Sequence, residues 1–90
     1  MLKLNLTSQF KRDLKLCKKR NYNIGLLTAI VDTLRIPAPL PPKNKDHCLK
    51  GNYTGRRECH ISTDWLLIYQ VNENELYLDR TGTHADLFGL

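Results

Sequence analysis

The sequence predicts an α+β fold of order β-α-α-β-β-β, with two N-terminal helices packed on one face of a small sheet that ends in an antiparallel meander. Two patterns support this. Apolar residues recur at helical spacing before residue 35, and short segments rich in branched and aromatic residues alternate with turn residues between 56 and 82. The chain has 90 residues, enough for one domain, 1–90, which buries only about 60% of its unfolded surface.

The N-terminal segment predicts a strand followed by a helix. Leucines at positions 2, 4 and 6 alternate with polar residues, which is typical of a strand with one buried face. Ser8 is the expected N-cap of the helix. The apolar positions of that helix are Phe10, Leu14 and Cys17, and lysines and arginines occupy its other faces.

A second amphipathic helix is predicted from Asn23, another suitable N-cap. Its apolar positions are Leu26, Leu27, Ile30, Val31 and Leu34. Four prolines between 36 and 42 exclude helix and central strand there, so an extended connector is expected. Residues 43–55 are polar, contain two glycines, and are predicted to form a loop.

Three strands are predicted in the C-terminal half, at 56–61, 64–71 and 75–80, joined by short turns. Thr81 and Gly82 are expected to end the last strand. Residues 65–69 are apolar at every position, which indicates a central strand that is covered on both sides. Two helices on one face would leave the other face open for a functional site.

The charge is uneven along the chain. Residues 1–50 carry 11 Lys/Arg against 3 Asp/Glu, whereas residues 51–90 carry 3 against 6. The basic half suggests an anionic partner, either nucleic acid or an acidic protein segment, although charge by itself is weak support and residues 18–20 alone are better explained as a solvated helix face. Three irregularly spaced cysteines are a poor disulfide framework, and no apolar run approaches the roughly 20 residues of a membrane span. We therefore expect a cytoplasmic protein that does not associate with membranes.

All three histidines, His47, His60 and His84, lie in the same half as Asp64 and Arg80. RNA cleavage needs a base for the ribose 2′-OH, a cation for the extra charge on phosphorus and an acid for the departing 5′-oxygen. Histidine, carboxylate and arginine supply all three without a metal or other cofactor. Each residue alone has a simpler explanation, as a surface or turn residue, so only the combination points to catalysis.

A metal site is the rival chemical interpretation. His47 is followed by Cys48, and Cys59 is followed by His60, which superficially pairs soft ligands. However, neighbouring residues on a strand point to opposite faces, and the spacings typical of zinc ligands are absent from the sequence. We expect no metal ligands.

Four blocks resemble the YafQ branch of the RelE/ParE toxin superfamily in order and at matching gaps over about the last 45 residues. The blocks are KDHCLKG (45–51), RECHI (57–61), DWLLIY (64–69) and RTGTHADLFG (80–89). The N-terminal half agrees only in its strand-helix-helix pattern. Two departures are clear, since a compared family member has proline where Cys48 and Thr63 stand; both changes free the backbone beside His47 and Asp64, and neither removes a reactive group.

The resemblance implies a RelE-like fold and the toxin of a type II toxin-antitoxin system, an endoribonuclease (mRNA interferase) that cuts mRNA in the ribosomal A site. It implies three partners: mRNA, the ribosome and a cognate antitoxin protein that neutralises the toxin. The family's functional residues match catalytic His47, His60, Asp64, Arg80 and His84, with Trp65 and Phe88 as substrate-binding residues.

We assign the expected roles as follows. His84 is the first choice as general acid or base, Asp64 and His60 act together across one tight turn, and Arg80 stabilises the phosphorane. Trp65 and Phe88 stack on bases, or alternatively belong to the core. The alternatives to an enzyme are a gyrase-poisoning module like ParE, which lacks this residue set, and a plain RNA-binding domain.

Overall fold

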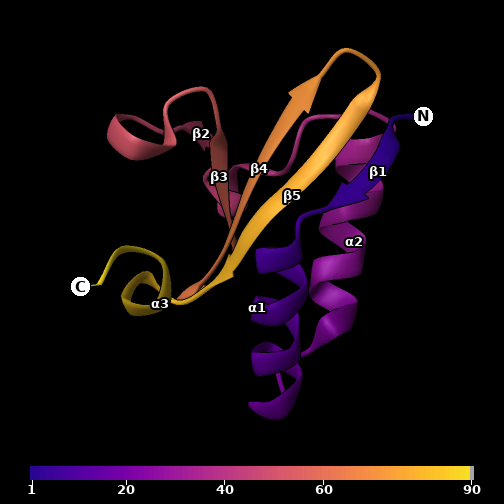
Figure 1. Ribbon diagram of the computed structural model, residues 1–90. Coiled ribbons are helices and arrows are strands. Elements are labelled where there is room, and N and C mark those ends of the chain that lie inside the picture. Colours follow the sequence, from indigo (N-terminus) through magenta and orange to yellow (C-terminus); the bar gives the residue numbers. More distant parts are fainter. Residues whose placement is uncertain (90) are drawn as a thin grey trace.

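The computed structural model describes residues 1–89 and shows two helices on one face of a five-stranded sheet (Figure 1). The elements are β1 (Lys3–Leu6), α1 (Ser8–Lys19), α2 (Ile24–Arg35), β2 (His47–Cys48), β3 (Arg57–Ser62), β4 (Trp65–Asn72), β5 (Glu75–Gly82) and α3 (His84–Phe88), with short 3-10 helices η1 (Pro42–Asn44) and η2 (Gly51–Tyr53). The predicted α+β architecture is confirmed. Leu90, the last residue of the predicted domain 1–90, lies outside the described residues.

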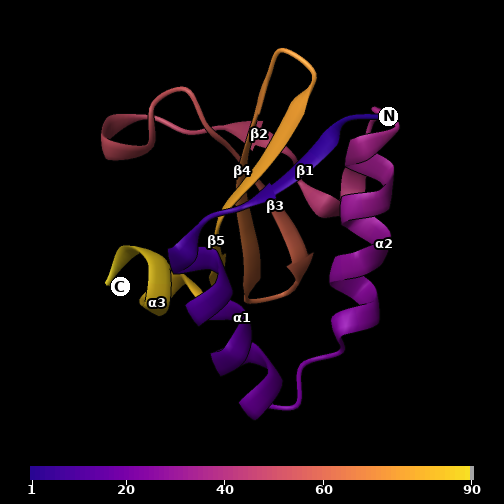
Figure 2. The same ribbon diagram turned by 45° about the vertical axis from the view of Figure 1, so that its right-hand side comes forward.

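The strands lie in the order β1-β5-β4-β3-β2. The pair β1–β5 is parallel, while β5–β4, β4–β3 and β3–β2 are antiparallel. The last three long strands form the predicted meander, and β4 is the central strand. Figure 2 shows α1 and α2 joined by a short connection at the end of the molecule away from the N-terminus. No helix in residues 1–89 has both the length and the apolar character needed to cross a membrane.

The helix caps follow local side-chain chemistry. Asn23 caps α2 as predicted, because its side chain accepts a hydrogen bond from the amide of Gly25. The prediction for α1 was wrong by one residue. Thr7, not Ser8, has the extended backbone of an N-cap, and its hydroxyl accepts a hydrogen bond from the amide of Phe10 at 3.0 Å.

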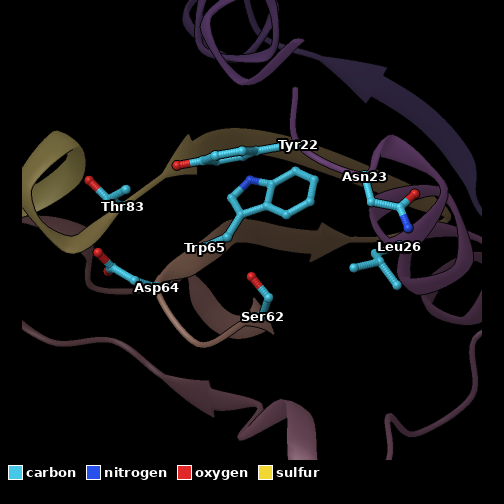
Figure 3. Close-up of a pocket in the computed structure, with 7 residues that line it drawn as sticks. All are labelled: Tyr22, Asn23, Leu26, Ser62, Asp64, Trp65 and Thr83. Atoms are coloured by element: carbon cyan, nitrogen blue, oxygen red, sulfur yellow. The ribbon is translucent and has the colours of Figure 1, made fainter. Parts of the chain in front are cut away.

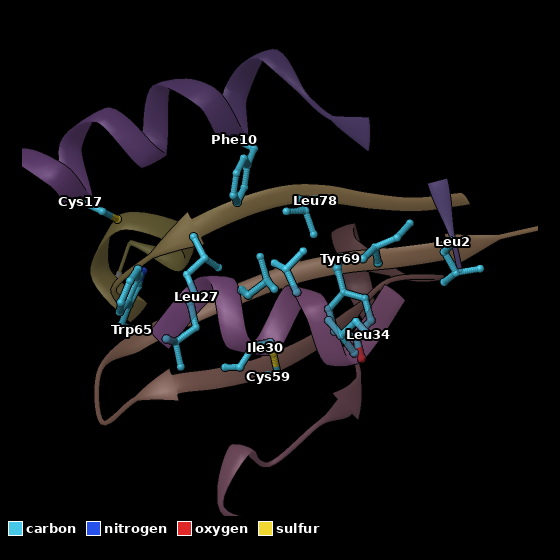
Figure 4. Close-up of a cluster of buried hydrophobic side chains, with 14 residues drawn as sticks. Leu2, Phe10, Cys17, Leu27, Ile30, Leu34, Cys59, Trp65, Tyr69 and Leu78 are labelled. Atoms are coloured by element: carbon cyan, nitrogen blue, oxygen red, sulfur yellow. The ribbon is translucent and has the colours of Figure 1, made fainter. Parts of the chain in front are cut away.

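The main core lies between the helices and the sheet (Figure 4). Phe10 lies above Leu78, and Trp65 and Leu2 lie near opposite ends of the layer. The buried members from the sheet are Cys59, Ile61, Trp65, Leu67, Tyr69, Leu76 and Leu78. Alternate residues of β3 and β4 therefore face the helices, as the period of a strand requires.

The opposite sheet face is partly covered. Leu66 and Ile68 of β4 are fully buried there under Leu87, with Tyr53 and Phe88 packed at the edge. Figure 1 shows α3 and the segment containing β2 on the side away from α1 and α2. The expected second covering of the central strand is confirmed, and the face is less open than predicted.

The secondary structure differs from the sequence prediction in several places. β3 and β4 are each displaced by one residue from the predicted 56–61 and 64–71. β5 continues through Thr81 and Gly82, which pair with Leu67 and Leu66 of β4, instead of ending before them. The polar stretch 43–55 contains β2, η1 and η2 in addition to loop. Helix α3 was not predicted, although Thr83 and Asp86 form a capping box that the sequence displays.

A bulge in β5 decides which face Arg80 occupies. Tyr69 pairs with Leu78 and Ile68 pairs with Arg80, so Asp79 is an extra residue without an opposite partner. Simple alternation would place Arg80 with Leu78, on the helix side. The extra residue instead moves Arg80 to the face of Ile68, away from the main core.

Candidate functional site

Two histidines meet on the sheet face opposite α1 and α2. His60 of β3 pairs with Leu66, whose side chain belongs to that face, and His84 opens α3 at the end of β5. Their ring centroids are 5.9 Å apart with an interplanar angle of 65°. Both rings are partly accessible, with 20% and 41% of the side-chain surface exposed for His60 and His84. Two groups capable of proton transfer therefore face one solvent-accessible region.

Asp64 holds His84 and not His60. Its Oδ1 lies 2.6 Å from Nδ1 of His84 and accepts a hydrogen bond from the backbone amide of His84 at 3.0 Å. The expected contact of Asp64 with His60 across the turn is not among the hydrogen bonds of residues 1–89, because the carboxylate bonds to His84 at the start of α3 instead. The two hydrogen bonds from His84 lower the pKa of Asp64. An ionised Asp64 orients the ring and leaves its Nε2 for chemistry.

Glu58 was not identified from the sequence, and it lies between two of the histidines. Its Oε1 is 3.4 Å from Nε2 of His47 and 3.8 Å from Nε2 of His60. The side chain is 6% exposed, and Oε2 has no hydrogen-bond partner among residues 1–89. Strand alternation could have identified it from the sequence, since Glu58 is two residues from His60 and therefore lies on the same side of β3.

Burial and neighbouring charges act on His60 in opposite directions. Desolvation is the largest influence and lowers the pKa of His60, while the carboxylate of Glu58 raises it. The charges of Lys45, His84 and His47 add to the lowering. Because the net shift is downward from 6.5, His60 is mainly neutral at pH 7 and can accept a proton.

The loop that carries His47 is fixed to the sheet from both sides. The Tyr69 hydroxyl donates to Asp46 at 2.6 Å, and Nε of Arg57 donates to the same carboxylate oxygen at 3.2 Å. Nδ2 of Asn44 donates to the backbone oxygen of His60 at 2.7 Å. His47 is thus held beside Glu58 although half of its side chain is exposed.

Arg80 reaches the same face from β5. It pairs with Ile68 on β4, while His60 pairs with Leu66 on the other side of β4. Neighbouring strands are about 4.8 Å apart and two residues along a strand span about 6.6 Å, so the backbones of His60 and Arg80 are separated by roughly 12 Å. Side chains as long as arginine and histidine can approach one phosphate across that distance.

The two predicted stacking residues have different environments. Phe88 is half-buried at the rim, with its ring 6.5 Å from that of His84 and in edge contact with Tyr53 at 5.8 Å. Trp65 is only 3% exposed and belongs to the helix-side core, where its indole donates to Thr81 at 2.8 Å. Figure 3 shows the Tyr22 ring against the indole. This placement favours the alternative interpretation of Trp65 as a core residue.

Two hollows lie near the histidine pair, one with His60 in its wall and the other with Asp64. One of about 360 Å³ is lined by Lys43, Lys45 and His60, among others, and offers two cations near an imidazole. The other, of about 260 Å³, lies beside Trp65 and includes Asp64 and Thr83 in its wall (Figure 3). The first suits an anionic group, because lysine ammonium groups bind phosphate as point charges.

The assembled groups can perform acid-base chemistry on a phosphodiester. The structure brings His47, His60, Asp64 and His84 together, with Phe88 beside His84. Arg80 lies on the far side of β4 from His60, with its guanidinium bound to Asp13 of α1. Within residues 1–89, no three His, Cys, Asp or Glu side chains are arranged to hold a metal ion. The cysteines Cys17 and Cys59 are buried and Cys48 is exposed, and all three are free thiols.

Comparison with known proteins gives consistent matches over nearly the whole chain. Residues 2–89 match the family described as "Bacterial toxin of type II toxin-antitoxin system, YafQ". The mRNA interferase toxin YafQ of Escherichia coli strain K12 is 39% identical over 87 residues, which are 96% of this chain and 95% of that protein.

Solved structures agree in backbone as well as in sequence. A copper-bound L66S mutant toxin from Helicobacter pylori superposes with a TM-score of 0.94 at 42% identity, covering 98% of this chain and all of the other. The toxin chain of the E. coli DinJ-YafQ toxin-antitoxin complex superposes with a TM-score of 0.90 at 38% identity, covering 98% of each chain.

Proposed function

This chain belongs to the YafQ family of toxins from type II toxin-antitoxin systems, and on that premise we propose that it is an mRNA interferase whose histidines cut RNA by acid-base catalysis. The observation that carries the proposal is the facing pair His60 and His84, with rings 5.9 Å apart and Asp64 on Nδ1 of His84. The family gives the class of activity, and the pair gives the groups that would perform it.

The reaction proceeds by attack of the ribose 2′-OH on the adjacent phosphorus. His60, neutral because burial lowers its pKa, accepts the 2′-OH proton as the new O2′–P bond forms. His84, oriented by Asp64, delivers a proton to the 5′-oxygen as the P–O5′ bond breaks. The products are a 2′,3′-cyclic phosphate and a free 5′-hydroxyl. The proton balance closes with no metal ion.

Three further groups stabilise charge around the reacting phosphate. Arg80 supplies a guanidinium to the developing phosphorane, whose extra negative charge suits a planar cation. His47 binds phosphate or relays a proton at the exposed end of the site. Glu58, between His47 and His60, compensates the positive charge that appears on His60 during attack.

The proposed partners follow from the family and from the charge of α1. The E. coli relative forms a complex with DinJ, and we propose a cognate antitoxin for this chain that covers the site or its rim. Five Lys/Arg residues lie on α1, a surface that suits ribosomal RNA or an acidic segment of the antitoxin. We propose that cleavage occurs on mRNA bound to the ribosome.

The decisive experiment compares induced expression of the wild type and of His84→Ala, with growth and cut sites on a translated mRNA as readouts. We expect in-frame cuts and growth arrest in the wild type, and neither in the variant. Growth arrest with intact mRNA and inhibited DNA supercoiling would instead indicate a gyrase poison. RNA retention without cuts would indicate a plain RNA-binding domain.

A further inference from the structure

Asp13 is the one acidic residue of α1, a helix with five basic side chains, and it is 9% exposed. Its carboxylate accepts four hydrogen bonds. The donors are Nε of Arg80 (2.7 Å), Nη2 of Arg80 (3.2 Å), the amide of Thr81 (3.2 Å) and Nε2 of Gln9 (3.0 Å). Half of these bonds come from the residue that we assign to the phosphorane, so Asp13 connects α1 to the site.

The topology of the sheet creates this contact. Strand β1 pairs with β5 only as far as Leu78, so within residues 1–89 no strand pairs with that side of Thr81 and Gly82. Asp13 accepts the edge amide of Thr81, which that missing strand leaves available. The bulge at Asp79 places Arg80 on the site face just before this point. The Arg80 guanidinium then reaches Asp13 at the sheet edge.

The pairing with Asp13 fixes both the position and the plane of the Arg80 guanidinium. Nε and Nη2 of Arg80 bind the two carboxylate oxygens separately, the fork geometry that restrains both position and plane. Nη1 of Arg80 makes neither of the bonds to Asp13, and the Tyr53 side chain is a further neighbour of the guanidinium. A free arginine would lose rotamer entropy on meeting a phosphate, whereas a restrained one has already lost it.

We propose that Asp13 is a positioning residue for RNA cleavage, holding the Arg80 guanidinium in the orientation in which it meets the scissile phosphate. The inference rests on the proposed function of Arg80. Asp13 does not touch the substrate, and its effect on the reaction passes through Arg80. The competing explanation is purely structural, namely that Asp13 only attaches α1 to the edge of β5.

The test uses Asp13→Asn in the wild type and in an Arg80→Ala background, with Asp32→Asn as a matched control. Asp32 is an exposed carboxylate of α2, so its loss changes net charge equally without contact to Arg80. We expect Asp13→Asn to lower kcat about 10- to 100-fold while KM changes less than about threefold. In the Arg80→Ala background the same change should alter kcat by less than about twofold, because its target is gone.

Equal slowing of the wild type and of Arg80→Ala by Asp13→Asn would overturn the proposal in favour of a structural role. NMR of the Arg80 Nε–H group gives a second readout that requires neither activity nor a folded variant. We expect its exchange with water to be slower than that of exposed Arg12, and equal rates would also overturn the proposal. A wild type that cuts no RNA but protects this group would contradict the proposed function alone.

Discussion

His84 and Asp64 are joined twice, through the ring nitrogen Nδ1 at 2.6 Å and through the backbone amide at 3.0 Å, both to the same carboxylate oxygen. The second bond places the carboxylate at the first turn of α3, so the position of the ring is tied to the start of its helix. A carboxylate that accepts from both groups fixes the ring's orientation and its tautomer together.

Replacing Asp64 by asparagine should therefore impair His84 as the general acid without unfolding the protein. We expect kcat of Asp64→Asn to fall by about 10- to 100-fold, because the amide is a weaker and differently polarised partner for Nδ1. Single-turnover cleavage of mRNA on ribosomes measures this, with Asp32→Asn as the charge-matched control. An unchanged rate in Asp64→Asn would show that the pairing has no part in catalysis.

The pH dependence of cleavage reports on His60. Its pKa lies below 6.5, so the base is deprotonated above that pKa and the rate falls as the pH drops through it. Glu58→Gln removes the charge that raises this pKa, so the acidic limb of the profile should move to lower pH. We measure kcat of the wild type and of Glu58→Gln from about pH 4.5 to about pH 8, a range that brackets the reference histidine pKa of about 6.5.

Glu73→Gln is the control for that experiment, because Glu73 is exposed in the β4–β5 turn and far along the sheet from His60.

The lowered pKa of His60 also predicts how the stability of the fold depends on pH. A histidine whose folded pKa is depressed stabilises the fold above its unfolded pKa, and this stability is lost as the pH falls below about 6.5. In the cleavage experiment, an acidic limb of the kcat profile that moves to higher pH in Glu58→Gln would contradict the assignment of His60 as the base.

We expect substitutions of Trp65 to affect mainly stability, as for a core residue, and substitutions of Phe88 to affect mainly RNA binding, as for a site residue. Trp65→Phe loses the indole bond to Thr81 and some packing, so we expect about 1–3 kcal/mol lower unfolding free energy and a cleavage rate within a few-fold of wild type. Phe88→Leu should keep stability and weaken RNA binding, because its ring borders His84. Urea unfolding and RNA binding measured on both variants test this, and the reverse pattern would restore Trp65 as a stacking residue.

Chelation should leave the reaction unchanged. The proposed proton transfers use imidazole groups and no metal-bound water, so removal of transition metals is expected to alter the cleavage rate by less than about twofold. Because ribosomes themselves need Mg²⁺, the assay uses ribosome-bound mRNA in excess Mg²⁺ with a chelator selective for transition metals. A rate lost with chelator and restored by zinc would replace acid-base catalysis with a metal mechanism.

Much of the fold could be predicted because its signals are local. The apolar spacing of α1 and α2, the cap at Asn23 and the short turns of the meander depend on residues a few positions apart. Helix α3 was missed despite its capping box, since a helix of five residues has too little periodicity to stand out. The strand β2 has two residues and depends entirely on pairing with β3.

The sequence by itself determined the order of the two long helices and the four long strands, and it supplied three histidines, an aspartate and an arginine suited to acid-base work. Only the tertiary structure decided that Asp64 hydrogen-bonds to His84 and that Asp13 hydrogen-bonds to Arg80. It also decided that Glu58 lies between His47 and His60. The physical reason is that these partners depend on strand register. The bulge beside Asp79 moves Arg80 to the other face of the sheet, and a second irregularity lies between His60 and Ser62. Both arise from pairing between strands and not from the residues of one strand.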